Sequence, residues 1–171
     1  MGITELKKEL KRLDKTKLID LIADLYKKNK SVRELLDFYV NPQEEEIFEK
    51  YRDKVFEAFY PSRGYKLKLK EGKQAIADFK KLGPSQDLLA DLMLFYVETG
   101  VKFTNEYGDI GESFYSSIES TYQAALKLMQ KEKLLEKFAD RAGKVVNDTS
   151  NIGWGFHDYL GDVHAEFYVN H

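Results

Sequence analysis

The sequence predicts an all-α fold in which eight or nine helices pack as antiparallel hairpins. Apolar residues recur with helical spacing along most of the chain, as at Leu18, Leu21, Ile22 and Leu25. Alternation with a period of two, which is typical of a strand, occurs only between residues 65 and 70. One short strand cannot form a stable sheet, so helices are expected to supply the whole core.

Nine segments carry the helical pattern. They are expected at residues 4–13, 15–29, 31–40, 43–59, 71–82, 85–107, 112–131, 133–148 and 157–168. The turns between most of them are short, so successive helices should lie antiparallel, either in a bundle or in a short helical-repeat solenoid. The helix at 85–107 is apolar on nearly every side, which is typical of a central helix that its neighbours cover. Five Phe-Tyr pairs are spaced without a fixed period and leave both arrangements open.

Two groups of residues indicate where helices begin. Ser31 and Glu34 have the spacing of a capping box, in which each side chain bonds to the backbone of the other residue. Asn41, Pro42 and Glu44 supply a capping side chain, a proline for the first turn and an acid that can bond back to the cap. We therefore expect helix starts close to both groups.

The turn between the helices at 85–107 and 112–131 has signals of its own. Gly108 is expected to end the first helix in the left-handed conformation. Asp109 and Glu112 have the spacing of a capping box for the second helix. This interpretation makes the turn structural, so replacing Asp109 by alanine should lower stability by about 0.5–2 kcal/mol through loss of a cap.

Composition limits the class of protein. The 171 residues suit a single all-helical domain over 1–171, and 43% hydrophobic with 33% charged residues is typical of a globular chain. No apolar run approaches the ~20 residues of a membrane span, and residues 1–13 are too highly charged for a signal peptide. The absence of cysteine excludes disulfides, thiolate metal sites and thiol nucleophiles. We therefore expect a cytoplasmic protein that does not bind membranes.

Charge is unevenly divided along the chain. Residues 1–83 contain 20 Lys and Arg against 15 Asp and Glu, a net charge of +5. Residues 84–171 contain 7 against 14, a net charge of −7. The basic half could attract an anionic partner. The same division would arise if the two halves attracted each other within one fold, which is the interpretation that we favour.

Short segments with a family resemblance run along nearly the whole chain: LYKKNK (25–30), PSRG (61–64), ADFKKL (77–82), YVETG (96–100) and GWGFHD (153–158). They resemble an uncharacterised family of small bacterial helical proteins, a domain of unknown function. The resemblance implies a bacterial cytoplasmic protein without an assigned activity, so no catalytic residues can be transferred to this chain. The hairpin over 85–131 is also similar to helical-repeat hairpins of adaptor proteins, which implies a role in binding another protein.

The basic segment, residues 60–73, is the main candidate for a binding surface. Basic side chains beside aromatic rings suit contact with phosphate groups of nucleic acid, or with an acidic or phosphorylated protein. A solvated loop, or ion pairs with the acidic half, would explain the same residues without a partner. In an extended chain Tyr65, Leu67 and Leu69 would face inward and the intervening lysines outward. The candidate surface residues are Arg63, Gly64, Lys66, Lys68, Lys70 and Lys73.

Two further candidates lie near the carboxyl end. Trp154, between two glycines, could be a recognition aromatic, although we favour a tryptophan that packs over the end of the core. His157, Asp158 and His164 could supply nitrogen and oxygen ligands to a metal ion. Partly buried, hydrogen-bonded histidines would explain the same pattern, and that is the interpretation that we favour.

These patterns together favour a non-enzymatic helical module that binds another protein. A nucleic-acid-associated accessory protein that uses the basic segment is the alternative, and a metal-dependent enzyme at the carboxy-terminal histidines is a further one. The sequence contains no phosphate-binding loop motif, dinucleotide fingerprint or serine-hydrolase motif. We therefore expect no cofactor and no catalytic residues.

Overall fold

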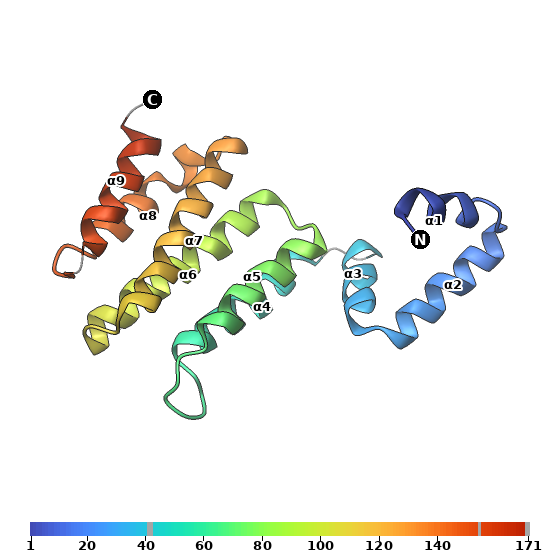
Figure 1. The fold of residues 1–171 in the computed structure, drawn as a ribbon, viewed down its shortest axis with the longest axis horizontal. Helices are drawn as coiled ribbons and strands as arrows, with labels where there is room; N and C mark the ends of the chain where they lie inside the picture. The colour runs from blue at the N-terminus through green and yellow to red at the C-terminus, as the bar shows by residue number, and fades with distance from the viewer. Residues whose placement is uncertain (41–42, 154, 170–171) are drawn as a thin grey trace. The chain divides into compact units, whose positions relative to one another are not determined.

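The computed structural model describes residues 1–40, 43–153 and 155–169, which form nine α-helices without a strand (Figure 1). The all-α prediction is therefore confirmed. The backbone divides into two compact units, residues 1–43 and residues 44–171. That the whole chain forms one domain stays a prediction.

The amino-terminal unit consists of α1 (Ile3–Leu10), α2 (Lys15–Lys28) and α3 (Lys30–Val40). Helices α2 and α3 pack against each other as a hairpin. The hydroxyl of Tyr26 donates to Asp37 Oδ1 at 2.9 Å, and the guanidinium of Arg33 donates to the Tyr26 carbonyl at 3.4 Å. Among the described residues of this unit, Phe38 alone is buried, so its other apolar side chains remain at least partly exposed to solvent.

The start of α3 differs from the predicted capping box. The helix begins at Lys30, and the side-chain oxygen of Asn29 accepts from the amide of Ser31 at 3.0 Å and from the next amide at 3.2 Å. The prediction of a Ser31–Glu34 box is wrong, because the earlier helix start moves the cap position to Asn29. The predicted cap and proline at 41–42 lie outside the described residues.

The carboxy-terminal unit consists of six described helices (Figure 1). These helices are α4 (Glu44–Phe59), α5 (Leu69–Leu82), α6 (Gln86–Tyr107), α7 (Glu112–Lys131), α8 (Leu135–Asn147) and α9 (Phe156–Tyr168). Each of α4, α6 and α8 packs against the helix that follows it. The contacts show that α6 and α7 are antiparallel, because Tyr96 reaches Ser117 whereas Thr104, further along α6, reaches Tyr115, earlier in α7. The predicted hairpins are therefore present in this unit.

Helix α6 lies at the centre of the carboxy-terminal unit, as its all-round apolar sequence predicts. It contacts α4, α5, α7 and α8. Its Tyr96 is fully buried and packs edge-to-face on Phe59 of α4, with ring centroids 4.9 Å apart. Phe59 also meets Phe114 of α7 edge-to-face at 6.1 Å, so aromatic rings join three helices in one core.

The alternation between residues 65 and 70, which could have indicated one short strand, does not form one. The amide of Lys68 donates to the carbonyl of Ala58 in α4 at 2.9 Å, and α5 begins directly afterwards at Leu69. A strand at this position would need a second strand to bond to its backbone amides and carbonyls. The described residues contain no second strand, so the alternation does not indicate a strand here.

The turn between α6 and α7 also differs from its prediction. Gly108 has the expected positive φ of 84°, but its ψ of −161° lies outside the left-handed helical region. The residue before α7 is Gly111, which has no capping side chain, so the predicted Asp109–Glu112 box is wrong. Asp109 instead accepts a hydrogen bond from the hydroxyl of Tyr115, because that buried hydroxyl needs an acceptor.

The Phe-Tyr pairs do not occupy equivalent positions. Phe38 is buried beside the exposed Tyr39, whereas in the pair at 95–96 the tyrosine is the buried member. The pairs alone therefore define no repeating unit. Within the described part of the chain, no helix has the length and apolar character that crossing a bilayer requires.

Candidate functional site

The basic segment is an ordered connection between α4 and α5 (Figure 1). At its start, the amide and the hydroxyl of Ser62 both donate to Glu57 Oε1, each at 2.7 Å. These two bonds lower the pKa of Glu57 by stabilising its charged form. At its end, Lys68 is held by its amide bond to Ala58, and Gly64 turns the chain between them with a φ of 80°.

A pocket of about 860 Å³ opens between this segment and the start of α7. Two turns of α7 supply Ser113, Phe114 and Ser117, and the preceding turn supplies Ile110. The basic segment supplies the remaining lining residues, which are Tyr65, Lys66, Leu67, Lys68, Leu69, Lys70, Glu71 and Lys73. The structure thus brings four of the six candidate residues of the basic segment to one pocket, whereas Arg63 and Gly64 do not line it.

The charges of this pocket, which we call the basic pocket, are mostly uncompensated. Glu71 is its one acidic lining residue, and it pairs with Lys68 at 3.6 Å. Lys73 donates to the hydroxyl of Ser120 at 3.0 Å, which leaves its positive charge in place. Among the described residues, no carboxylate lies within ion-pair distance of Lys66 or Lys70. Lys66 and Lys70 therefore do not form the expected ion pairs with the acidic half of the chain.

The directions of the side chains differ in part from the alternating prediction. Tyr65, expected to face inward, has a fully exposed ring. Leu67 and Leu69 are partly buried, as expected, and Lys66 and Lys70 are exposed. The prediction for Tyr65 is wrong because the loop has no sheet behind it to receive a side chain at that position.

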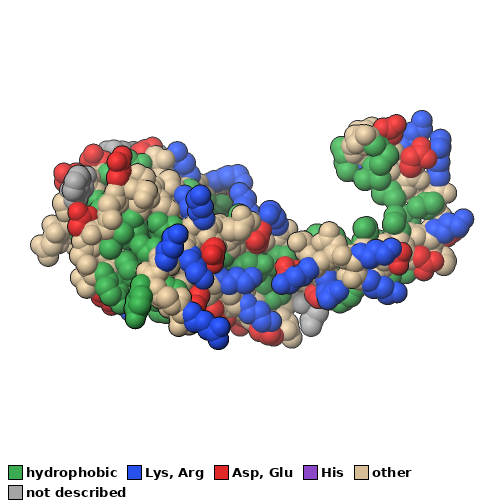
Figure 2. All heavy atoms as spheres, turned by 60° about the horizontal axis from the view of Figure 1, so that its bottom comes forward, with side chains coloured by type: hydrophobic (Ala, Val, Ile, Leu, Met, Phe, Trp, Pro, Cys, Tyr) green, Lys and Arg blue, Asp and Glu red, His purple; other side chains and the backbone are tan. Residues whose placement is uncertain are grey.

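Close packing of α5 places Lys73 within reach of α7. A Cβ at Gly72 would lie 2.9 Å from Tyr96 Cε2 and 3.0 Å from Ala58 Cβ, so only glycine allows this approach of α5 to α4 and α6. Gly72 is therefore required for the close packing of α5 in the wall of the pocket. Lysine and arginine side chains are numerous on the side of the carboxy-terminal unit that Figure 2 turns toward the viewer.

Sequence reasoning missed the α7 wall of the basic pocket. Ser113, Ser117 and Ser120 stand at i, i+4 and i+7, so they share one helix face, and two of them line the pocket. That spacing could have indicated a polar face on the helix at 112–131. Their meeting with the basic segment depends on contacts between residues about 45 positions apart in sequence, as the bond from Lys73 to Ser120 shows.

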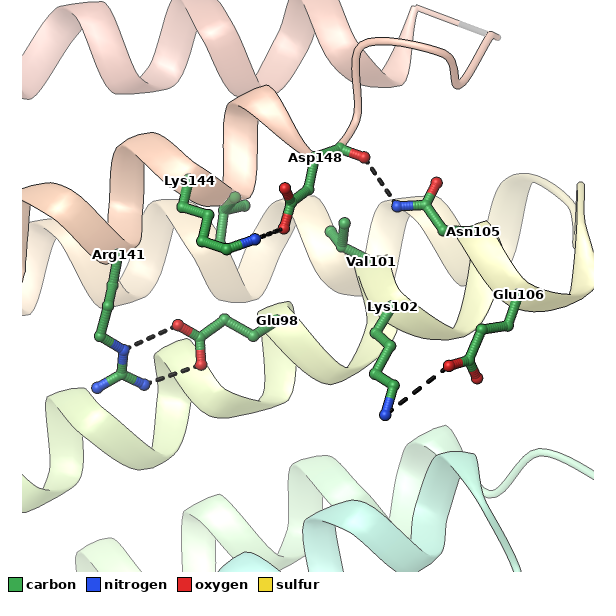
Figure 3. Close-up of a pocket in the computed structure, with 9 residues that line it drawn as sticks. Glu98, Val101, Lys102, Asn105, Glu106, Arg141, Lys144 and Asp148 are labelled. Carbon is green, nitrogen blue, oxygen red and sulfur yellow. Dashed lines mark hydrogen bonds and ion pairs between the residues drawn. The ribbon is translucent and has the colours of Figure 1, made fainter.

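A second pocket, of about 550 Å³, lies between α6 and α8 (Figure 3). Arg141 of α8 binds both carboxylate oxygens of Glu98 at 2.8 Å, and it also donates to Asp91 at 2.8 Å. These carboxylates raise the pKa of Arg141 by stabilising its charge. Lys144 pairs with Asp148 in the same pocket. The main charged groups here are thus matched to each other, which suits a link between helices.

The carboxy-terminal histidines are engaged in local contacts. His157 Nδ1 lies 3.0 Å from Thr149 Oγ1 and 3.2 Å from the Val146 carbonyl. The Thr149 hydroxyl itself donates to Val146, so both oxygens are acceptors and Nδ1 carries the proton. His164 stacks on Tyr168 with centroids 4.6 Å apart, and burial lowers the pKa of His164.

The described residues contain no group of three His, Asp or Glu side chains arranged to hold a metal ion. His157, Asp158 and His164 are therefore not assembled into the predicted alternative metal site. Trp154, the remaining predicted surface residue, lies outside the described residues.

Comparison with known proteins covers almost the whole chain. A family model described as "Family of unknown function (DUF6155)" matches residues 1–168. The chain belongs to the DUF6155 family. This agrees with the resemblance of its sequence segments to a domain of unknown function. No curated protein matches this DUF6155 chain. No solved structure matches it.

Proposed function

We propose that this DUF6155 chain is a non-enzymatic helical module that binds an acidic segment of another protein in the basic pocket. The uncompensated charge of Lys66 and Lys70, which both line a pocket, is the observation that carries the proposal. The resemblance of its sequence to small bacterial proteins supports a bacterial, cytoplasmic setting.

The lining of the basic pocket suits a peptide better than a lone ion. Leu67, Leu69, Ile110 and Phe114 contribute apolar surface between the lysines and the α7 serines. An acidic segment would place carboxylates against the ammonium groups and apolar side chains on this surface. Ion pairs of carboxylates with exposed lysines contribute about 0.2–1 kcal/mol each, so the apolar contacts must add to them.

The charge of the carboxy-terminal unit favours a short anionic segment over a long polyanion. Residues 44–171 contain 17 basic against 22 acidic residues, a net charge of −5. A net negative charge of the unit as a whole disfavours a long polyanion more than a short segment that contacts the basic pocket alone. One observation supports the nucleic-acid alternative: the fully exposed ring of Tyr65, beside Lys66, is available for stacking on a base.

Binding of two labelled probes tests the proposal: a glutamate-rich peptide that contains leucine and phenylalanine, and a single-stranded RNA of the same length. We expect the wild-type chain to bind the peptide, and the Lys66→Glu/Lys70→Glu variant to bind it at least about tenfold more weakly. Lys80→Glu/Lys127→Glu, which reverses two exposed lysines elsewhere, is the matched control and should bind normally.

The outcomes separate the two candidate functions. Equal peptide binding by both double variants, or no peptide binding by the wild type, would contradict the proposal. RNA binding that exceeds peptide binding, falls steeply with salt and is lost in Lys66→Glu/Lys70→Glu would favour the nucleic-acid alternative. Thermal unfolding of each variant shows that it is folded, because isolated surface charges change stability by less than ~0.5 kcal/mol.

A further inference from the structure

Ser117 joins the basic pocket to the core of the carboxy-terminal unit. It lines the pocket, and its Oγ lies 2.8 Å from the hydroxyl of Tyr96, a side chain without exposed surface. A buried phenol has to donate its hydrogen, and Ser117 Oγ is the one acceptor that it reaches among the described residues. Because the Tyr96 hydroxyl donates to Ser117, the hydrogen of Ser117 is left for an acceptor in the pocket.

Lys73 is held beside Ser117 by a short chain of hydrogen bonds. Its Nζ donates to Ser120 Oγ at 3.0 Å, and the Ser120 hydroxyl in turn donates to the carbonyl of Ser117 at 3.1 Å. An ammonium group has three N–H donors, so two of them remain for a ligand. Ser117 and Ser120 share one face of α7, which places the ammonium group of Lys73 within about one helical turn of the Ser117 hydroxyl.

The polar side chains of the basic pocket are mainly hydrogen-bond donors. Four lysines line it against one acid, Glu71, which gives the lining a net charge of +3. Glu71 is already paired with Lys68. A phosphoryl group on serine or threonine carries about −1.5 to −2 charges at pH 7 and offers three acceptor oxygens. A glutamate side chain carries one charge on two oxygens, so a phosphoryl group uses more of the donors in this lining.

We propose that the segment bound in the basic pocket carries a phosphorylated serine or threonine, whose phosphoryl group accepts from Ser117 and Lys73. This inference rests on the proposed function and names the chemical group that the pocket recognises. The exposed ammonium groups of Lys66 and Lys70 attract any acidic segment. Ser117 and Lys73 add two neighbouring donors, which a phosphoryl group can engage while a third oxygen still faces the other lysines.

Three versions of the glutamate-rich peptide test the inference, with phosphoserine, glutamate or serine at the central position. We expect the wild-type chain to bind the phosphoserine peptide at least about fivefold more tightly than the glutamate peptide. Tyr96→Phe/Ser117→Ala should bring these two affinities within about twofold of each other. This double variant removes both hydroxyls, so no buried phenol is left without an acceptor.

Two single variants complete the experiment. Lys73→Met changes an exposed side chain and leaves the core intact, and it should reduce the preference for phosphoserine in the same way. Ser116→Ala, at an exposed serine of α7 that does not line the basic pocket, is the matched control and should keep the full preference. Circular dichroism and thermal unfolding show that each variant is folded.

The outcomes separate this inference from the function on which it rests. If the wild-type chain binds the glutamate and phosphoserine peptides equally, the inference is overturned and the proposed function stands. If it binds neither peptide, both are overturned. A preference for phosphoserine that survives in Lys73→Met and in Tyr96→Phe/Ser117→Ala overturns the inference, because the preference then arises elsewhere. Single-stranded RNA that binds more tightly than the phosphoserine peptide, and is lost in the same variants, overturns it in favour of nucleic-acid phosphate.

Discussion

The hydroxyl of Tyr115 donates a hydrogen bond to Asp109 Oδ1 across the turn between α6 and α7, at 2.9 Å. The same hydroxyl lies 3.1 Å from Thr104 Oγ1, which donates to the carbonyl of Gly108 at 3.0 Å. Burial raises the pKa of Tyr115, because a phenolate would lose its hydration there. A buried tyrosine of the following helix, rather than a side-chain cap, therefore holds this turn.

This arrangement predicts a coupled pair of substitutions. Asp109→Ala and Tyr115→Phe should each lower the free energy of unfolding by about 1–2 kcal/mol, since each removes the same hydrogen bond. The double variant should lose less than the sum of the two effects, as measured by urea denaturation. Tyr107→Phe, at an exposed tyrosine of the same turn, is the control and should change stability by less than ~0.5 kcal/mol. Strictly additive losses would favour the capping account.

Gly108 is expected to be intolerant of any side chain. Its φ of 84° and ψ of −161° fall in a region that is essentially restricted to glycine. Gly108→Ala should therefore cost about 1–3 kcal/mol, although the Cβ itself would meet no atom within 4 Å. Gly143→Ala, inside α8 with 3.6 Å to His164 Nε2, should be neutral or slightly stabilising. Equal melting temperatures for the two variants would contradict this reading of the turn.

Gly100 allows α6 and α7 to approach closely. A Cβ at this position would lie 2.2 Å from Ile118 Cδ1 and 3.2 Å from Phe59 Cε1, so Gly100→Ala should cost about 1–3 kcal/mol by overpacking. Ile118→Val removes the atom that clashes most and alone should cost about 0.5–1.5 kcal/mol. We expect the double variant, in chemical denaturation, to be more stable than the two single effects predict. If the effects simply add, the contact is not the cause of the loss.

The helices could be predicted from the sequence to a large extent because their signals are local. The apolar stripes and glycines place each helix within two residues of its observed bounds at nearly every end, as for α7, expected and found at 112–131. The caps were less predictable. Ser31 and Asn29 both suit the start of α3, and the choice depends on where the preceding helix ends.

Only one wall of the basic pocket, the basic segment, could be predicted from the sequence. The run of lysines identifies the basic segment, but the serines of α7 face it because of how α5, α6 and α7 pack together. Asp109 shows the same limit. Its sequence position suits a helix cap, but its side chain instead accepts a hydrogen bond from Tyr115. Contacts between residues distant in sequence decided each of these cases.

Stability should depend on pH through His164. Burial lowers its pKa from the ordinary 6.5, so between the two values the unfolded chain binds more protons than the folded one. The wild-type chain should therefore be fully stable above about pH 6.5 and lose stability as the pH falls through that window. His164→Gln removes this loss. A pH series of unfolding free energies for both proteins isolates the effect, and a difference that does not change with pH would contradict it.

The most direct test of the proposed function is to map where an anionic segment binds on the wild-type chain. Amide chemical shifts of the labelled protein can be followed while a glutamate-rich peptide is added. The account predicts that the largest shifts occur at Lys66, Lys70, Ser113 and Ser117, on both walls of the basic pocket, and that they disappear in Lys66→Glu/Lys70→Glu. Shifts confined to other surfaces, or no shifts at all, would contradict it.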